Sequence, residues 1–235
     1  FTVNNTTKVT LEQIPSHWFK NLPIYLPTRE LITIYPEFLS WYETAHLPFE
    51  QTWRDTCLLL GTPLAKDQQP FKPLLKPLEA AMKGTVELAK NGRFYLNSAG
   101  NKMEMQLVAE GFRKLALIAR LIANGHLGNQ SCLFWDEPES NLNPKMIKMI
   151  AGVLLHLCQQ GVQVFIASHS LFLLRELDIL LNSNEFKEIA ARFIGLHYSD
   201  EHIVIEQGDT IDNIGDIDAL QEELYQSDRY LDLEA

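Results

Sequence analysis

The stretch that decides the fold is Cys132-Leu133-Phe134-Trp135-Asp136-Glu137-Pro138, where an apolar run ends in two adjacent carboxylates. A short apolar run of this kind predicts a buried strand. Ligands of open parallel sheets bind beyond the carboxyl ends of the strands. Two negative charges at a buried strand end are costly unless a cation or ligand compensates them. The stretch therefore predicts a ligand site at the end of this strand.

Mg²⁺ bound to a polyphosphate is the simplest ligand that would compensate the two charges of this acidic pair. We expect Asp136 to orient the water shell of the metal. Glu137 would orient or deprotonate an attacking water. The alternative is an acidic turn that merely ends a strand, and the motif by itself leaves that alternative open.

A helix and a second strand come after the acidic pair. Pro144–Gln160 has apolar residues at helical spacing, with Asn143 as a candidate cap and Gly161 as a stop. Val162–Ala167 predicts another buried strand. A strand, helix and strand of this length form a βαβ unit with parallel strands. His169 should therefore emerge at the same sheet edge as the carboxylates, although a single histidine at a strand end is more often a surface residue.

Another candidate site precedes the acidic strand, at Leu107-Val108-Ala109-Glu110-Gly111-Phe112-Arg113-Lys114. Residues 111–124 predict a helix. Its N-terminus would present free N–H groups and the positive end of the helix dipole to an anion. The alternative is that Gly111 only makes a plain turn.

The flanking regions predict smaller elements. Asn91-Gly92 between two β-like runs predicts a hairpin, and Thr28 could cap a following helix. The other expected elements are short strands in 1–26, helices in 30–62 and 72–84, hairpin strands at 85–88 and 93–96, a third run at 103–108, a helix at 171–181, strands at 192–198 and 202–206, and an acidic amphipathic helix in 216–235. In the helical region we interpret the many aromatic residues as the core of a small lobe rather than an exposed binding stripe.

The charge of the chain is concentrated at one end. The formal net charge is −10, and the residues from Asp200 onward hold 12 acidic residues against one basic residue, Arg229, which leaves 18 acidic and 19 basic residues elsewhere. The three cysteines show no CxxC pairing, so neither a disulfide framework nor a zinc site is indicated. No apolar run approaches the roughly 20 residues of a membrane span. We predict a cytoplasmic protein with no membrane partner.

The order of these motifs resembles that of ABC-type ATPases, especially the SMC, RecF and OLD branch, which is similar to the AAA_15 and AAA_21 groups. The resemblance covers roughly residues 105–206 well. It implies an α/β fold: an ABC ATPase head, P-loop NTPase-like, with a mostly parallel sheet core and a small helical lobe. The implied domains are strands of the head in 1–29, the lobe in 30–84, the ATPase core in 85–206 and an acidic helix and tail in 207–235.

The resemblance also implies roles for the acidic pair and for residues C-terminal to it. Asp136 would lie on the magnesium side, Glu137 would be the catalytic glutamate, and His169 would be the switch histidine at the γ-phosphate. The implied cofactors are ATP and Mg²⁺. The D-loop would span Ser140 to Asn143, with binding residues Ser140, Asn141 and Asn143.

By the same resemblance, Val108–Phe112 is the signature motif that caps the ATP of the opposite subunit. Two departures stand out: Ala109 replaces the signature serine and Glu110 replaces its first glycine, while Gly111 is kept. A G-x-x-x-x-G-K-[ST] phosphate-binding loop is found nowhere in the sequence. We therefore expect that loop upstream of Phe1 and expect the chain alone to be inactive.

The run Ile24-Tyr25-Leu26-Pro27-Thr28-Arg29-Glu30 resembles a segment of PtuA-type defence ATPases of Septu and retron systems. That resemblance implies a role in anti-phage defence, with an HNH nuclease partner, or nucleic acid, or reverse transcriptase and msDNA in a retron setting. A homodimer or higher oligomer is expected, regulating an associated effector. The alternative is a nucleotide-binding scaffold without turnover. A fused nuclease is disfavoured because only about 30 residues come after residue 206.

Overall fold

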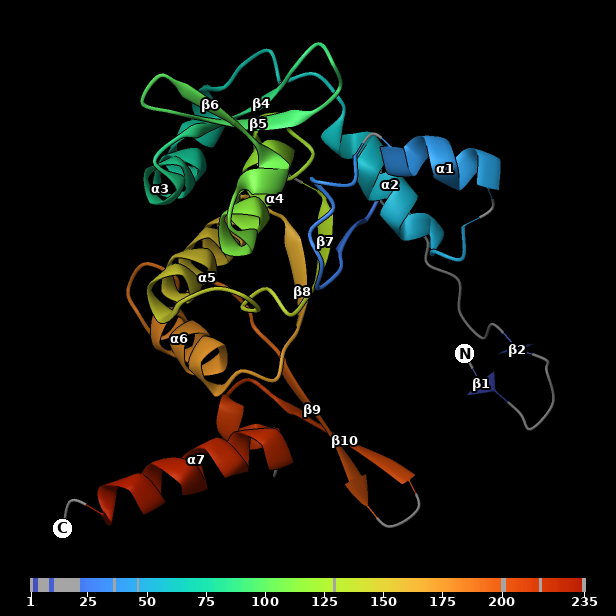
Figure 1. Cartoon of the computed structure of the whole chain (residues 1–235). Helices are drawn as coiled ribbons and strands as arrows, with labels where there is room; N and C mark the ends of the chain where they lie inside the picture. Colours follow the sequence, from blue (N-terminus) through green and yellow to red (C-terminus); the bar gives the residue numbers. More distant parts are fainter. Residues whose placement is uncertain are drawn as a thin grey trace.

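The computed structural model describes residues 2–3, 9–10, 22–35, 37–45, 47–128, 130–199, 202–215 and 217–233 (Figure 1). The fold is mixed α/β, as predicted, with a small parallel sheet at its centre. Among these residues no helix is both long and apolar enough to cross a membrane. Of the strands predicted in 1–26, Thr2–Val3 (β1) and Val9–Thr10 (β2) form an antiparallel pair, and residues 11–21 lie outside the described residues.

The central sheet has the strand order β3-β7-β8, with both neighbouring pairs parallel. Its strands are Ile24–Leu26 (β3), Cys132–Asp136 (β7) and Gln163–Ala167 (β8). The predicted adjacency of the second and third strands is confirmed. Helices α4 (Glu110–Ala123) and α5 (Pro144–Gln159) lie on one side of these strands (Figure 1).

The opposite face of this sheet is open, which corrects the prediction that β8 is buried. Along β8 the side chains alternate between exposed and half-buried. The rings of Phe134 and Phe165 stack at 4.7 Å and are 39% and 44% exposed. An apolar run such as that of β8 predicts burial because parallel strands are usually covered on both faces. Here the described residues cover one face only.

The helical region contains α1 (Glu37–Ala45), α2 (Gln51–Leu60), η1 (Gln69–Phe71) and α3 (Lys72–Met82). Its apolar side chains belong to the same buried cluster as those of the central sheet. Phe38 is buried among other aromatic rings, but Trp41 is 62% exposed. The aromatic residues therefore form a core only in part, and the proposed domain boundaries stay a prediction.

The predicted hairpin is confirmed: β4 (Thr85–Leu88) pairs antiparallel with β5 (Phe94–Ser98). The predicted extent of the third strand, residues 103–108, was wrong. Strand β6 covers Asn101–Glu104, and a 3₁₀ turn, η2 (Met105–Leu107), comes after it. The side chain of Met105 is buried where this turn feeds α4, so packing rather than period sets the boundary.

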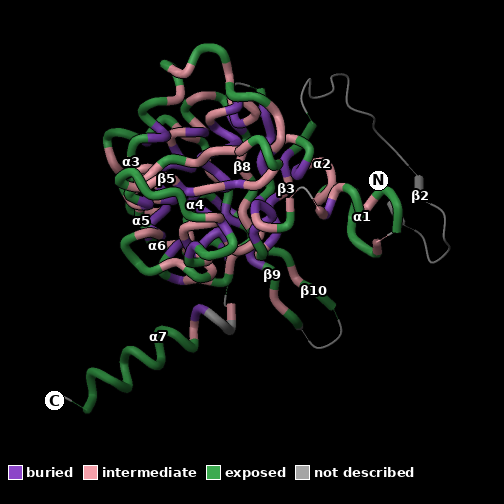
Figure 2. The backbone as a smooth tube through the Cα atoms, turned by 45° about the horizontal axis from the view of Figure 1, so that its top comes forward, coloured by how far each residue is buried: buried purple, intermediate pink, exposed green. Residues whose placement is uncertain are grey.

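The C-terminal elements stand outside the central sheet. After α6 (Leu171–Leu181), which was predicted, β9 (Phe193–Ser199) and β10 (His202–Gly208) form their own antiparallel sheet. They are succeeded by η3 (Ile211–Asn213) and the predicted helix α7 (Asp218–Leu231), which is exposed along most of its length (Figure 2). A small apolar cluster joins these elements to α6, through Leu171, Phe193, Ile214 and Leu220.

Candidate functional site

The ends of β7 and β8 bring the acidic pair and the histidine together. Asp136 lies opposite Ala167 in the parallel register, and the N–H of Glu137 donates to the carbonyl oxygen of Ala167 at 2.8 Å. His169 Nδ1 is 3.2 Å from Glu137 Oε1. The predicted shared edge is therefore present in the structure. We call these three side chains, Asp136, Glu137 and His169, the rim.

The rim is open to solvent. The side chain of His169 is 66% exposed and that of Glu137 is 31% exposed. Asp136 is half-buried. Charges in such positions are hydrated and available to a ligand, whereas a purely structural ion pair would gain little there.

The backbone of Glu137 is held in an unusual conformation, with φ of 47°. Left-handed backbone is uncommon for residues other than glycine and costs free energy that the surroundings must repay. On one side the N–H of Glu137 is bound to β8, and on the other its carbonyl oxygen accepts from Lys114 Nζ at 2.8 Å. These two bonds fix the direction in which the Glu137 carboxylate leaves the strand.

Lys114 is the main residue that the sequence interpretation missed. It lies on α4, is 2% exposed, and donates to the carbonyl oxygen of Glu137 and the hydroxyl of Ser140. Burial lowers the pKa of its ammonium group, and the charge of Glu139 is the largest opposing influence. The signal that could have found it is helical spacing, because Lys114 lies on the same side of the predicted helix as apolar Leu117 and Ile118.

Asp136 is held from the neighbouring strand. The hydroxyl of Thr28, just beyond β3, donates to Asp136 Oδ2 at 3.0 Å. Thr28 was predicted as a helix cap, but α1 begins only at Glu37, so that role is wrong. The hydroxyl orients one carboxylate oxygen of Asp136.

A second missed pair joins the two strand ends. Ser168, next to the histidine, donates its hydroxyl to Glu139 Oε1 at 2.6 Å. Glu139 is 9% exposed, and its Oε2 has no hydrogen-bond partner within the described residues. The sequence pattern in 139–144 predicts mainly a helix start, yet Glu139 ties the turn after β7 to the end of β8.

The segment predicted as a D-loop lies against the start of α4. A Cβ atom on Gly111 would come within 2.7 Å of the Asn141 carbonyl oxygen, so only glycine allows this approach. Asn141 and Asn143 are exposed, and Ser140 is half-buried on Lys114. Asn143 caps α5 as predicted, because its side chain accepts from the N–H of Met146.

The predicted signature residues form the N-terminus of α4. Ala109 is the N-cap residue, is exposed, and makes no side-chain capping bond. Glu110 begins the helix half-buried, and Gly111 is buried. Arg113 braces this end by donating to the Val108 carbonyl at 2.7 Å and to the buried Glu30 carboxylate at 2.9 Å. These bonds hold the N-terminal end of α4 in place.

A family comparison decides how this geometry is to be understood. Residues 21–175 match the family AAA_21, described as "AAA domain, putative AbiEii toxin, Type IV TA system". The chain belongs to this family. All the site residues described above lie within the matched part, whereas β9, β10 and α7 lie outside it. Membership in this AAA family supports an ATPase-like, nucleotide-binding function.

Solved structures give weaker likenesses. An SMC head domain from Pyrococcus furiosus, bound to the C-terminal domain of ScpA, is 12% identical with a TM-score of 0.43, covering 68% of this chain and 37% of that one. Another SMC head, bound to the winged-helix domain of ScpA, is 12% identical with a TM-score of 0.46, covering 83% and 53%. Our chain therefore spans well under two thirds of either. A comparison with curated proteins gave no match.

The oxygen atoms available at the rim suit Mg²⁺ bound to a nucleotide. Among the described residues no group of three or more His, Cys, Asp or Glu side chains could hold a metal ion by itself. Mg²⁺ in nucleotide sites uses one or two carboxylates together with water and phosphate oxygens. Asp136 and Glu137 supply two carboxylates and no cage, which suits that mode of binding.

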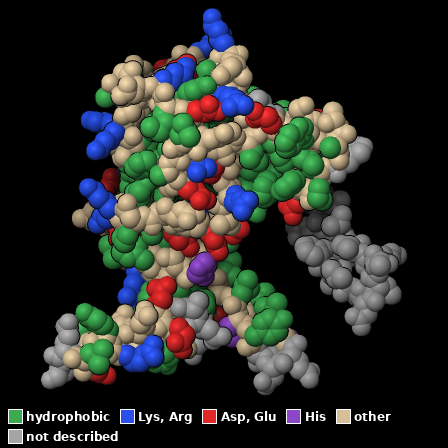
Figure 3. Space-filling view, viewed as in Figure 1, with side chains coloured by type: hydrophobic (Ala, Val, Ile, Leu, Met, Phe, Trp, Pro, Cys, Tyr) green, Lys and Arg blue, Asp and Glu red, His purple; other side chains and the backbone are tan. Residues whose placement is uncertain are grey.

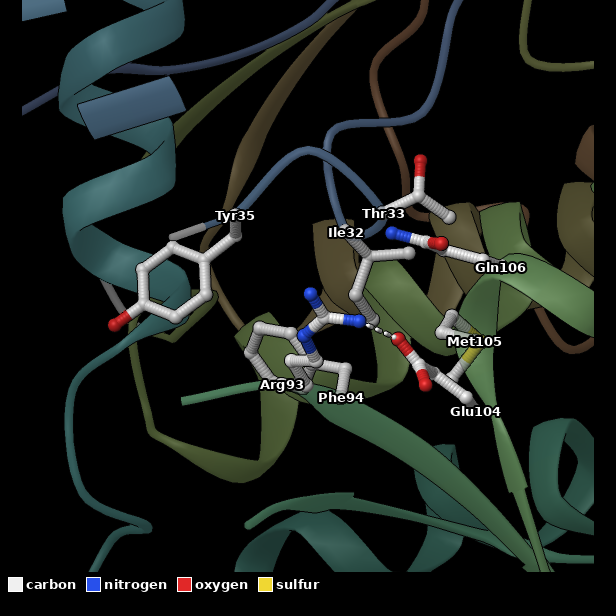
Figure 4. A pocket seen from close by; sticks show the side chains of 8 residues that line it. All are labelled: Ile32, Thr33, Tyr35, Arg93, Phe94, Glu104, Met105 and Gln106. Atoms are coloured by element: carbon white, nitrogen blue, oxygen red, sulfur yellow. Dashed lines mark hydrogen bonds and ion pairs between the residues drawn. The ribbon is translucent and has the colours of Figure 1, made fainter. Parts of the chain in front are cut away.

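The concavity drawn in Figure 4 is unrelated to this site. It lies between the turn at residues 32–35 and strands β5 and β6, where Arg93 pairs with Glu104 at 2.5 Å. Its volume of about 10 Å³ leaves room for at most one water molecule. None of the rim residues lines it.

Proposed function

We propose that this AAA_21 domain is the hydrolytic part of an ABC/SMC-like ATPase, which binds and hydrolyses ATP with Mg²⁺. The observation that carries the proposal is the 3.2 Å approach of His169 to Glu137 at the ends of two adjacent parallel strands. The pair lies beside a second carboxylate, Asp136. Few structural roles require an exposed imidazole and two carboxylates on one rim.

In this proposal each rim residue has a distinct task. Glu137 orients the attacking water and accepts its proton, because a carboxylate fixed in direction can act as a general base. His169 contacts the terminal phosphate and holds Glu137 in position. Asp136, with one oxygen fixed by Thr28, binds on the metal side. Bound Mg²⁺ would neutralise charge on the phosphates.

The phosphate-binding loop must come from outside the 235 residues, because the sequence contains none. The open face of the central sheet supports this arrangement. Tyr25, Phe134 and Phe165 share that face by register, and both phenylalanine rings are exposed. Parallel sheets are normally covered on both faces. We assign this face to the layer that carries the phosphate-binding loop.

The N-terminus of α4 is assigned to a second subunit's nucleotide. A helix N-terminus suits an anion, and Gly111 lets the helix lie close to Asn141. Each site would then combine Asp136, Glu137 and His169 of one copy with Gly111 of another, in a head-to-tail dimer or higher oligomer. Because Ala109 offers no hydroxyl and Glu110 adds negative charge, activation across the dimer should be weak.

Turnover is proposed to regulate an attached effector, such as a nuclease in anti-phage defence. The family description names a putative toxin and a toxin–antitoxin system, and a toxin is an effector of this kind. The proposed domains keep the same division: head strands in 1–29, a helical lobe in 30–84, the ATPase core in 85–206 and the acidic end in 207–235.

The test is phosphate release by the natural assembly, meaning this chain together with the polypeptide that carries the phosphate-binding loop. Glu137→Gln should keep ATP binding and lower turnover by about 100-fold or more. Glu188→Gln, which removes an exposed carboxylate outside the rim, is the matched control and should leave turnover unchanged. Equal turnover in wild type and Glu137→Gln would remove Glu137 from this role.

A nucleotide-binding scaffold without turnover is the second candidate. The departures at Ala109 and Glu110 favour it, since both weaken the end of α4 that would face ATP. In that case the wild-type assembly would bind ATP tightly but release no phosphate above the level of Glu137→Gln.

A further inference from the structure

The β9–β10 ribbon has one apolar face that nothing in the described residues covers. In the antiparallel register Leu196 lies opposite Ile205, and Tyr198 opposite Ile203. Opposite residues share a face, and Ile194 joins them by the two-residue alternation of β9. These five side chains are between 57% and 83% exposed. Figure 3 shows apolar side chains gathered over the ribbon. We call this surface the ribbon face.

The other face of the ribbon is already occupied. A Cβ atom on Gly195 would come within 2.0 Å of the Ile214 carbonyl oxygen, so the segment after η3 lies directly against it. His197 and Glu206 are also on this inner face, with their side chains 3.8 Å apart. These titratable groups of the ribbon therefore point away from the ribbon face.

A two-stranded ribbon with one uncovered apolar face is expected to be only weakly stable in water. Isolated two-stranded sheets are marginally stable and need a third layer on their apolar side. Apolar patches of several hundred Å² usually mark a binding surface. The exposed surface of α7, the next helix along the chain, differs from the ribbon face, because its apolar residues Leu224 and Tyr225 lie among acidic residues. Two copies of α7 would repel each other, whereas the five side chains that form the ribbon face carry no charge.

We infer that the ribbon face binds the ribbon face of a second copy of this chain, independently of nucleotide. Full cover of the five side chains would bury on the order of 700 Å² per copy, or roughly 1,400 Å² in total, within the range of stable specific interfaces. The five side chains carry no charge, so they can meet their counterparts across a two-fold axis without bringing like charges together. The nearest described charges that flank them, Arg192 and Asp209, pair with each other at 3.3 Å. This contact is separate from the head-to-tail dimer proposed above.

The experiment is analytical ultracentrifugation of the natural protein with EDTA and no nucleotide. Wild type should contain two copies of the chain at micromolar concentration. Leu196→Asp should weaken that association by at least about 100-fold, because each copy would bury a carboxylate. Ile179→Asp on α6 is the matched control, since Ile179 is 63% exposed and Leu196 is 61% exposed, and it should leave the dimer intact.

Two results would overturn the inference: a single copy of wild type under these conditions, or an unchanged dimer with Leu196→Asp. The first is also the outcome expected if another part of the same protein or a different protein covers the ribbon face. Should Leu196→Asp fail to fold by circular dichroism, Leu196→Ala replaces it, with about tenfold weaker association expected. ATP turnover plays no part in the measurement, so the failure of either proposal leaves the other standing.

Discussion

The two ends of α4 are treated very differently by the rest of the molecule. At its C-terminal end Arg120, which is 5% exposed, donates to the carbonyl oxygens of Leu60 and Thr62 at 3.0 and 2.6 Å. Asn124 donates to the Leu59 carbonyl at 2.7 Å. These bonds give donors to carbonyl oxygens at and just beyond the end of α2, and they lock α4 to that helix.

At the N-terminal end the helix begins at an exposed alanine without a side-chain cap, Ala109. Just before it, Leu107 is 77% exposed. An end left like this costs stability, because serine, threonine or aspartate at the cap would satisfy one of the free N–H groups. The C-terminal end of α4 is therefore bonded to the end of α2, whereas its N-terminal end is held by Arg113 and lacks a side-chain cap.

Between these ends Lys114 connects α4 to the rim. It binds the Glu137 carbonyl and the Ser140 hydroxyl from one buried position. A movement of the N-terminal end of α4 would therefore be transmitted to Glu137, the proposed general base. Changes near Lys114 should alter turnover, and changes at the anchored end should alter stability alone.

The largest effect is expected from Lys114→Met, which keeps the length of the side chain but removes the ammonium group. The Glu137 carbonyl and the Ser140 hydroxyl would lose their donor, and buried Glu139 would lose the nearby positive charge. We expect the free energy of unfolding to fall by about 3 kcal/mol, and turnover to fall at least about tenfold as Glu137 shifts. Urea unfolding and phosphate release measure the two effects, with exposed Lys145→Met as the control.

The next effect is expected at the anchored end. Arg120→Met leaves the Leu60 and Thr62 carbonyls without their donors and should lower the free energy of unfolding by about 2 kcal/mol. Turnover per folded molecule, measured well below the melting temperature, should stay within about twofold of wild type. A loss of turnover as large as that of Lys114→Met would break the comparison between the two ends.

Gly111→Ala tests the close approach at the N-terminal end of α4. The new Cβ would meet the Asn141 carbonyl oxygen at 2.7 Å, and the backbone there must shift. We expect a loss of about 1–2 kcal/mol in unfolding free energy, together with slower turnover, seen by calorimetry and phosphate release. Gly152→Ala, at a helical glycine with open space around its Cβ, should be neutral or slightly stabilising.

The smallest effect is a pH dependence at the anchored end. His126 Nε2 lies 2.8 Å from the Thr62 hydroxyl, and burial lowers the pKa of this imidazole below its ordinary 6.5. The unfolded chain then takes up the proton first, so the contribution to stability is complete above pH 6.5 and is lost as pH falls below it. The loss should be under about 1 kcal/mol, because the site is part-exposed. Melting temperatures at pH 7.5 and 5.5 should differ less in His126→Asn than in wild type.

Much of the site could be predicted from the sequence, because it depends on local pattern and chain order. An apolar run before Asp136, a helix of periodic residues and a second run before His169 together require parallel strands that end at one edge. Asn143 was identifiable as a cap because the cap and its proline are adjacent in sequence.

The remainder depends on contacts between distant residues. Thr28 reaches Asp136 across 108 positions, and Ser168 reaches Glu139 across 29; neither pairing leaves a local signal. Lys114 was hidden because a lysine in a helix is usually solvated. The bare faces of β8 and of the ribbon could not be foreseen either, since a pattern gives the side on which residues lie but not what covers that side.

The central claim is that Glu137 and His169 act as one unit on the nucleotide. The most direct test is a double-mutant cycle in single-turnover ATP hydrolysis by the natural assembly, with Glu137→Gln, His169→Gln and both changes together. Residues that act as a unit give non-additive losses, so the double variant should be no slower than the slower single variant, within about threefold. Losses that multiply across the two variants would show independent roles and contradict the account.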